Sequence, residues 1–348
     1  MSRIQLRTGP GFLLAAGVAL AAAVPLAVEY KKAEFRKAER QDAEQKKVDQ
    51  AIADQTKARD DSKQEGRKFE VEFRPDVVFG TGAGEELTLD LAMPKGSIAE
   101  APGLVFIHGG SWQSGNKDDF AGQAKEAAAA GYLAVSINYR LAPKHLFPAQ
   151  VEDCKCAVRW LRAHAGELRL DRERIGAFGW SSGGHLALML GVTEPSDGLE
   201  GDGGWGDQSS KVQAVVSYVG ATHLIGDFSI ASVNILRTFL GGTMDEKREL
   251  YLQASPISYV DAGDPPMLLF AGTNDPLVQY DQAFQMAKAL SDAGVSGRVE
   301  FLLGAGHVFS PQEMKRTMLE AMEFFDEALG PGRVEINSRP TTPRSLLR

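Results

Sequence analysis

The sequence predicts an α/β protein with a mostly parallel central sheet and helices on both of its faces. Between residues 69 and 330, short apolar runs rich in β-branched residues alternate with longer segments of helical periodicity. Such alternation is typical of strand–helix–strand units with right-handed crossovers. The chain has 348 residues, of which 43% are hydrophobic, so it contains enough apolar side chains for a large core. An open parallel sheet places its chemistry at the carboxyl ends of its strands, so functional residues are expected directly after strands.

The elements follow in order along the chain. Eight apolar runs are expected as strands, over residues 77–79, 87–93, 104–107, 133–138, 175–180, 212–219, 267–272 and 298–303. Five segments are expected as helices, over residues 119–130, 149–164, 183–192, 280–293 and 311–329. Residues 194–208 are rich in Gly and Asp and are expected to form a surface loop, and residues 331–348 to form a weakly ordered tail.

The first 28 residues have the pattern of an export segment. Arg3 and Arg7 precede an uncharged stretch over residues 8–28, and small residues allow cleavage before Val24. The stretch also just reaches bilayer-spanning length, so a cleaved signal peptide and a retained membrane anchor both stay open. A buried helix of a cytosolic protein is less favoured, because the flanks are basic and no amphipathic period is visible.

Residues 29–68 form a second, highly charged segment. Pairs of opposite charge such as Glu34 and Lys37 lie three or four residues apart, which favours a solvated helical stalk. The globular part is then residues 69–330. We expect it to be exported, as a periplasmic, secreted or membrane-anchored domain outside the cytoplasm.

Charge and cysteine content disfavour two classes of partner and site. The formal net charge is −8 and the sequence pI is near 5.4, so no excess of Lys and Arg is present to neutralise a nucleic-acid backbone. The two cysteines, Cys154 and Cys156, lie two residues apart in a predicted helix and point to different sides. We therefore expect neither a disulfide framework nor a zinc site.

A candidate nucleophile lies between a predicted strand and a predicted helix. Residues 179–183 read Gly-Trp-Ser-Ser-Gly, which is the G-x-S-x-G pattern in its strand–turn–helix context. The turn has to be sharp, so Gly179 and Gly183 must lack side chains, and Ser181 then stands at its apex. A tight Gly-Ser turn without chemistry is the structural alternative.

A serine hydroxyl needs a base to take its proton and a third group to orient that base. His307 directly follows the last predicted strand in a Gly-flanked loop, whereas the other five histidines have ordinary structural explanations. Asp275 follows the strand over residues 267–272, unlike the competing Asp227, Asp245 and Asp261. The chain order Ser181, Asp275, His307 is the one known from serine hydrolases with an open parallel sheet.

Backbone donors for a developing oxyanion are expected at two places. The residues His-Gly-Gly-Ser-Trp at 108–112 end an early strand, and the N–H groups of Gly109 and Gly110 are the candidates there. Ser111 stays open as a further donor. The N–H of Ser182, next to the nucleophile, is expected to add another.

Together these residues resemble the α/β-hydrolase superfamily, and within it the carboxylesterase branch with hormone-sensitive-lipase-like and acetyl- or feruloyl-esterase-like enzymes. The motifs are HGGSW at 108–112, NYRLAPKHLFPA at 138–149, GWSSGGHLA at 179–187, ASPISYV at 254–260, GTNDPLV at 272–278 and GAGH at 304–307. The resemblance implies Ser181 as nucleophile, Asp275 and His307 as its partners, and no metal or organic cofactor.

The sequence departs from the family pattern at two positions. Ser111 replaces the third glycine of the branch's HGGG pattern, and Trp180 adds bulk beside the nucleophile. Residues 221–253 are expected to form either lid material or ordinary helices between two strands. The apolar side chains that could wall an acyl pocket there are Leu224, Phe228, Ile230, Ile235, Phe239 and Leu240.

Three functions compete. The first is an exported carboxylic ester hydrolase that forms an acyl-enzyme, acting on a small-molecule or polysaccharide-linked ester. The second is an amide hydrolase, formamidase-like or peptidase-like, on the same fold. The third is a tethered binding module without catalysis, which would predict the loss of a catalytic group, and the sequence lacks none. The sequence does not indicate an acyl-chain length or an oligomeric state.

Overall fold

A computed structural model of the chain describes residues 69–96, 100–226 and 228–330. The expected export segment at 1–28, the charged stalk at 29–68 and the tail at 331–348 lie outside these residues, and the domain boundaries stay predictions. Among the described residues, no helix is both long and apolar enough to cross a membrane.

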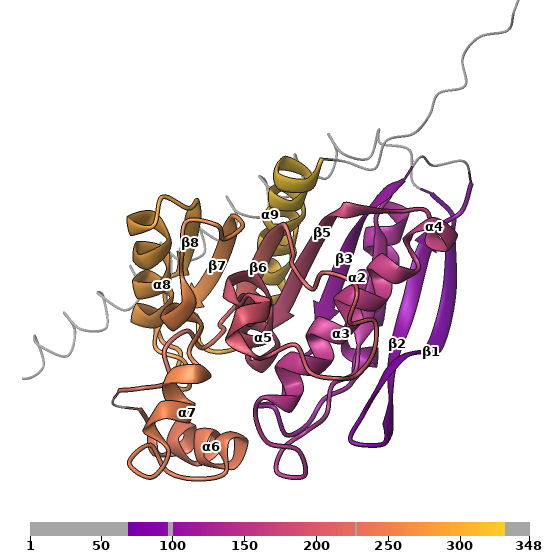
Figure 1. Cartoon of the computed structure of the whole chain (residues 1–348). Helices are drawn as coiled ribbons and strands as arrows, with labels where there is room; N and C mark the ends of the chain where they lie inside the picture. The colour runs from indigo at the N-terminus through magenta and orange to yellow at the C-terminus, as the bar shows by residue number, and fades with distance from the viewer. Residues whose placement is uncertain (1–68, 97–99, 227, 331–348) are drawn as a thin grey trace, which may run out of the picture. The chain divides into compact units, whose positions relative to one another are not determined.

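The core of the fold is an eight-stranded sheet, as the sequence predicts (Figure 1). Its spatial order is β1-β2-β4-β3-β5-β6-β7-β8. β2 runs antiparallel to both of its neighbours. The other six strands that follow it in this spatial order, β4, β3, β5, β6, β7 and β8, run parallel to one another. The strands are β1 (Val71–Gly82), β2 (Glu85–Pro94), β3 (Ala101–Ile107), β4 (Leu133–Ile137), β5 (Leu170–Trp180), β6 (Ala214–Tyr218), β7 (Met267–Gly272) and β8 (Gly297–Leu302).

Helices pack on both faces because successive side chains of a strand point to opposite sides. In β5, Ile175 and Ala177 join one hydrophobic cluster with α3, α5 and α8, whereas Phe178 joins a second cluster with α2 and α9. The five predicted helices are confirmed to within two residues at each end, as α2 (Ala121–Ala129), α3 (Ala149–Ala163), α5 (Ser182–Val192), α8 (Tyr280–Asp292) and α9 (Pro311–Leu329). α9 begins where the sequence indicates, with Pro311 in its first turn and the Ser310 hydroxyl accepting from the N–H of Glu313.

Further helices and turns complete the described domain. Two of them, α6 and α7, lie between β6 and β7 in the predicted lid segment, and Figure 1 shows them together beyond one end of the sheet. These elements are α4 (Ala165–Leu168), α6 (Ile230–Leu240), α7 (Arg248–Gln253) and the 3₁₀ turns η1 (Lys117–Phe120), η2 (Pro195–Asp197) and η3 (Pro256–Tyr259).

The Gly- and Asp-rich stretch at 194–208 is held to the domain by an ion cluster. Lys155 and Arg159 point from α3 toward it, with side chains only 1% and 2% exposed. Lys155 Nζ lies 2.7 Å from Glu200 Oε1, and Arg159 Nη1 lies 2.6 Å from Glu200 Oε2. Lys155 also donates to the carbonyl of Thr193, and Arg159 to those of Glu200 and Gly204. The loop therefore lies at the surface, as the sequence predicts, and buried cations anchor it there.

Candidate active site

Ser181 lies at the apex of the turn between β5 and α5. Its backbone has φ 55° and ψ −118°, a left-handed conformation that costs free energy for a non-glycine residue. A Cβ on Gly179 would overlap the carbonyl of Gly183, and one on Gly183 would overlap the carbonyl of Ile107. Both glycines are needed, for the reason that the sequence pattern implied. The Ser181 N–H donates to the carbonyl of Tyr218 at 2.8 Å, which ties the turn to β6.

The structure brings the three predicted residues into one hydrogen-bonded series. Ser181 Oγ lies 2.8 Å from His307 Nε2, and His307 Nδ1 lies 2.7 Å from Asp275 Oδ2. Asp275 follows β7 and His307 follows β8, so the parallel sheet places both at the same edge as Ser181. With a proton on Nδ1 shared with the carboxylate, Nε2 is left to accept the hydroxyl proton of Ser181.

The Asp275 carboxylate is held by backbone as well as by the imidazole. Its Oδ1 accepts from the N–H groups of Leu277 and Val278, at 2.8 and 3.0 Å. The side chain is fully buried, whereas that of His307 keeps 17% exposure toward the pocket. Backbone donors and burial thus fix the carboxylate, and the carboxylate fixes the imidazole.

The loop after β3 holds two of its backbone carbonyls in hydrogen bonds, and the oxyanion donors Gly109, Gly110 and Ser182 stay a prediction. The carbonyl of Gly109 accepts from His108 Nδ1 at 2.7 Å, and that of Gly110 accepts from the N–H groups of Gln113 and Ser114, each at 3.0 Å. Because N–H and C=O of one peptide point in opposite directions, the N–H groups of Gly110 and Ser111 face away from these bonds. A Cβ on Gly109 would lie 3.5 Å from Ser181 Cβ, so the loop passes directly over the nucleophile.

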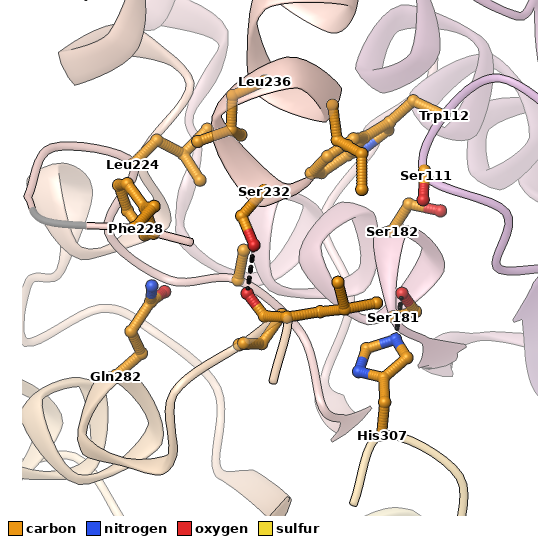
Figure 2. Close-up of a pocket in the computed structure, with 14 residues that line it drawn as sticks. Ser111, Trp112, Ser181, Ser182, Leu224, Phe228, Ser232, Leu236, Gln282 and His307 are labelled. Carbon is orange, nitrogen blue, oxygen red and sulfur yellow. Dashed lines mark hydrogen bonds between the residues drawn. The ribbon is translucent and has the colours of Figure 1, made fainter. Parts of the chain in front are cut away.

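Ser111, which stands where the HGGG pattern has its third glycine, adopts a backbone conformation that favours glycine. Gly110 has φ 116°, Ser111 has φ 57° and Trp112 has φ 59°. A glycine at 111 would adopt this conformation without strain, whereas Ser111 needs the loop to hold it there. The side chain of Ser111 lines the pocket next to Ser182 (Figure 2).

An aromatic support under this loop was not found by sequence reasoning. The Trp112 ring stacks on Phe239 of α6 at 4.1 Å, and its Nε1 donates to His185 Nδ1 at 3.2 Å. His185 Nε2 in turn donates to the carbonyl of Ala254 at 2.8 Å. Burial lowers the pKa of His185 to about 4, so it is neutral at neutral pH, as both bonds require. The sequence analysis does not count His185 among the catalytic residues. It also gives no sign that His185 joins α5 to α6 and to the loop after β3.

A pocket of about 460 Å³, part of it open to solvent, adjoins Ser181 and His307. Its walls are mainly apolar, with Leu224, Phe228, Ile235, Leu236, Leu277 and Val278 among them. The expected lid residues Leu224, Phe228 and Ile235 do line it. Phe239 and Leu240 instead lie fully buried in the core. The expectation that Ile230 lines the pocket is wrong, because Ile230 begins α6 facing outward and is 83% exposed.

Within the described ranges, no three His, Cys, Asp or Glu side chains gather as the ligands of a metal ion would. The two cysteines are buried and unpaired on α3. Burial raises the pKa of the Cys156 thiol to about 11, so at neutral pH it is a thiol rather than a reactive thiolate.

The chain is similar to several proteins named as esterases. The family model BD-FAE matches residues 89–290. Esterase LipC of Mycobacterium tuberculosis is 34% identical over 229 residues, which cover 62% of this chain and 55% of that protein. The chain thus spans about half the length of the curated relatives it matches.

Two solved structures cover the domain more completely. An esterase of Thermogutta terrifontis with bound propionate is 28% identical, with a TM-score of 0.63 over 77% of this chain and 97% of its own. That esterase has also been solved phosphorylated by paraoxon. A truncated carbohydrate esterase from gut microbiota is 25% identical, with a TM-score of 0.62 over 75% of this chain and 98% of its own.

Proposed function

Because the chain belongs to the BD-FAE family, we propose that it is a serine carboxylic ester hydrolase in which Ser181, His307 and Asp275 are the catalytic residues. The observation that carries the proposal is the unbroken series from the strained Ser181 through His307 to the buried Asp275, with bonds of 2.8 and 2.7 Å. This is the arrangement that activates a serine hydroxyl for attack on an acyl carbon.

The reaction follows from the positions of these groups. Ser181 Oγ attacks the ester carbonyl carbon while His307 Nε2 takes the hydroxyl proton, and Asp275 stabilises the resulting imidazolium. The charge on the carbonyl oxygen is met by the N–H groups of Ser182 and of the loop after β3. His307 then gives its proton to the leaving alcohol, which leaves an acyl group on Ser181. Water attacks this acyl-enzyme with His307 again as the base, and the carboxylic acid departs.

Ester and amide substrates of the same acyl group distinguish the competing functions. We expect rapid hydrolysis of p-nitrophenyl acetate and butyrate and little hydrolysis of the matching p-nitroanilides, measured by release of the chromophore. Paraoxon is expected to inactivate the protein with one phosphoryl group per chain, located on Ser181 by mass spectrometry. Faster anilide than ester hydrolysis would favour an amide hydrolase. A protein inert toward all of these reagents would favour a binding module.

We propose an ester attached to a carbohydrate as the substrate class. The similarity to a carbohydrate esterase supports it, and the largely apolar pocket beside Ser181 offers a place for a compact acyl group. Titration of the released acid at constant pH, which needs no chromophore, compares acetylated and feruloylated polysaccharides with long-chain lipid esters.

We also propose that the enzyme is exported, on the strength of the basic and apolar pattern over residues 1–28. The full chain produced in a bacterial host is expected to appear outside the cytoplasm, and a chain lacking residues 1–28 inside it. Mass spectrometry of the exported protein shows whether it begins at Val24 or keeps its anchor. An uncleaved full chain that stays in the soluble cytoplasmic fraction would contradict the proposal.

A further inference from the structure

Gln282 is a polar residue in the otherwise largely apolar wall of the active-site pocket. It belongs to the first turn of α8, is only 6% exposed and lines the same pocket as Ser181 and His307. In Figure 2 its amide group lies below Phe228, on the side of the view opposite Ser181. A buried amide at such a place needs partners for both its oxygen and its nitrogen.

The orientation of this amide is fixed by its oxygen. Oε1 accepts from the N–H of Thr222 at 2.9 Å and from that of His223 at 3.3 Å. The Thr222 hydroxyl also donates to the backbone carbonyl of Gln282 at 2.9 Å, which locks the two segments together. Turning the amide over would place its NH₂ group against two N–H donors, so the nitrogen must face away from them.

The nitrogen is therefore the end of the amide that lies away from these two N–H groups, in a side chain that lines the pocket. Among the described residues, the hydrogen bonds of Gln282 involve its Oε1 and its backbone carbonyl, and none involves Nε2, which carries two hydrogens. The Ser232 hydroxyl, by contrast, already donates to the carbonyl of Leu277 at 2.8 Å. When a substrate group displaces water from the apolar pocket, an unpaired amide donor costs free energy unless the group supplies an acceptor.

We propose that Gln282 Nε2 donates a hydrogen bond to an acceptor oxygen carried on the substrate group that fills the pocket. Gln282 is then a specificity-determining residue, which selects esters with an ether, keto or hydroxyl oxygen over their hydrocarbon counterparts. This inference rests on the proposed esterase function, and it adds what the apolar walls alone do not provide. Such walls by themselves would discriminate against an oxygen, because it loses hydration without a partner.

The test replaces one CH₂ of the substrate by oxygen. In the acyl arm, p-nitrophenyl valerate is compared with its methoxypropionate analogue. In the alcohol arm, butyl acetate is compared with methoxyethyl acetate. Longer homologues of both arms move the oxygen outward one carbon at a time.

At the best position, kcat/KM of the wild type is expected to be about ten-fold higher for the ether than for its carbon counterpart, the size of one good hydrogen bond. The arm in which this occurs tells whether the acyl or the alcohol group occupies the pocket.

Q282E removes the donor and keeps the acceptor. Its carboxylate can still receive the N–H groups of Thr222 and His223, so the local fold has its partners. We expect the preference for the ether to fall to about one or below, because two acceptors then face each other. Q285E adds the same charge to the exposed side of α8 and is expected to keep the wild-type ratio.

Ratios that are equal in the wild type and Q282E at every oxygen position would overturn the role of Gln282. So would a wild type that discriminates against the ether throughout both arms, a comparison that does not depend on whether Q282E folds. Hydrolysis of the hydrocarbon esters would show in either case that the esterase function stands. Failure of the wild type on all esters would instead reject the proposed function itself.

Discussion

Replacing Ser181 by alanine is expected to lower kcat on p-nitrophenyl acetate by about a million-fold, as in serine hydrolases whose residues act as one unit. The methyl group cannot attack the acyl carbon, and His307 and Asp275 have no other nucleophile within hydrogen-bond distance of Nε2 in the described structure. The residual rate would come from the backbone donors and from substrate binding. The measurement is a steady-state assay at neutral pH, with the ester in excess and a far-UV spectrum to show that the fold is kept.

Ser291 offers a matched control for this substitution. It lies on the exposed side of α8, and S291A is expected to keep wild-type activity. The paraoxon label should disappear in S181A and persist in S291A. Retention of more than about one hundredth of the wild-type kcat in S181A would mean that another residue attacks, and the assignment of the nucleophile would then be wrong.

Replacing Glu200 by alanine is expected to lower the free energy of unfolding by about 3–5 kcal/mol, the cost of leaving a buried ion cluster without one partner. Lys155 Nζ and Arg159 Nη1 lie 2.7 and 2.6 Å from its two oxygens, and neither cation can reach solvent without moving α3 or the loop at 194–208. Urea unfolding at pH 7 measures the change. D292A removes an ion pair on α8 whose side chains are more than half exposed, and it is expected to cost no more than about 0.5 kcal/mol.

The effect of Glu200 also has a defined pH dependence. Partial burial raises the pKa of its carboxyl, but the hydrogen bonds from Lys155 and Ser210 outweigh burial and hold the pKa below its ordinary value of 4.5. The stabilisation is therefore complete above pH 4.5 and is lost as the pH falls through the lower pKa of the folded protein. The difference in unfolding free energy between the wild type and E200A should shrink in that acid range. A difference that is constant down to the lowest pH at which both fold would contradict the ion-cluster explanation.

Local sequence patterns were enough to predict the sheet, its main helices and the meeting of Ser181, Asp275 and His307. Strands buried on both faces appear as continuous apolar runs, and each of the three residues directly follows such a run. In a parallel sheet these carboxyl ends necessarily lie along one edge, so position in the sequence translated into position in space.

The remaining features depend on contacts that no local pattern records. Gln282 lies about a hundred residues beyond Ser181 in the chain, and only the packing of α8 against the segment at 222 brings its amide to the pocket. The stack of Trp112 on Phe239 likewise joins distant segments. Ile230 was wrongly placed in the pocket because an apolar residue at the start of a helix gives no sign of which way it faces. The loop at 194–208 does lie at the surface, but its anchoring was not predicted, because Glu200 contacts cations some forty residues earlier in the chain.

The short segment after Asp275 serves two purposes with different parts of the same residues. The main-chain N–H groups of Leu277 and Val278 hold the acid in place, while their side chains form one boundary of the cavity. Any amino acid except proline supplies the N–H, so the identities at 277 and 278 are free to vary without loss of the support for Asp275. Substrate range can therefore diverge here, in nature or by engineering, while the chemical machinery is inherited intact.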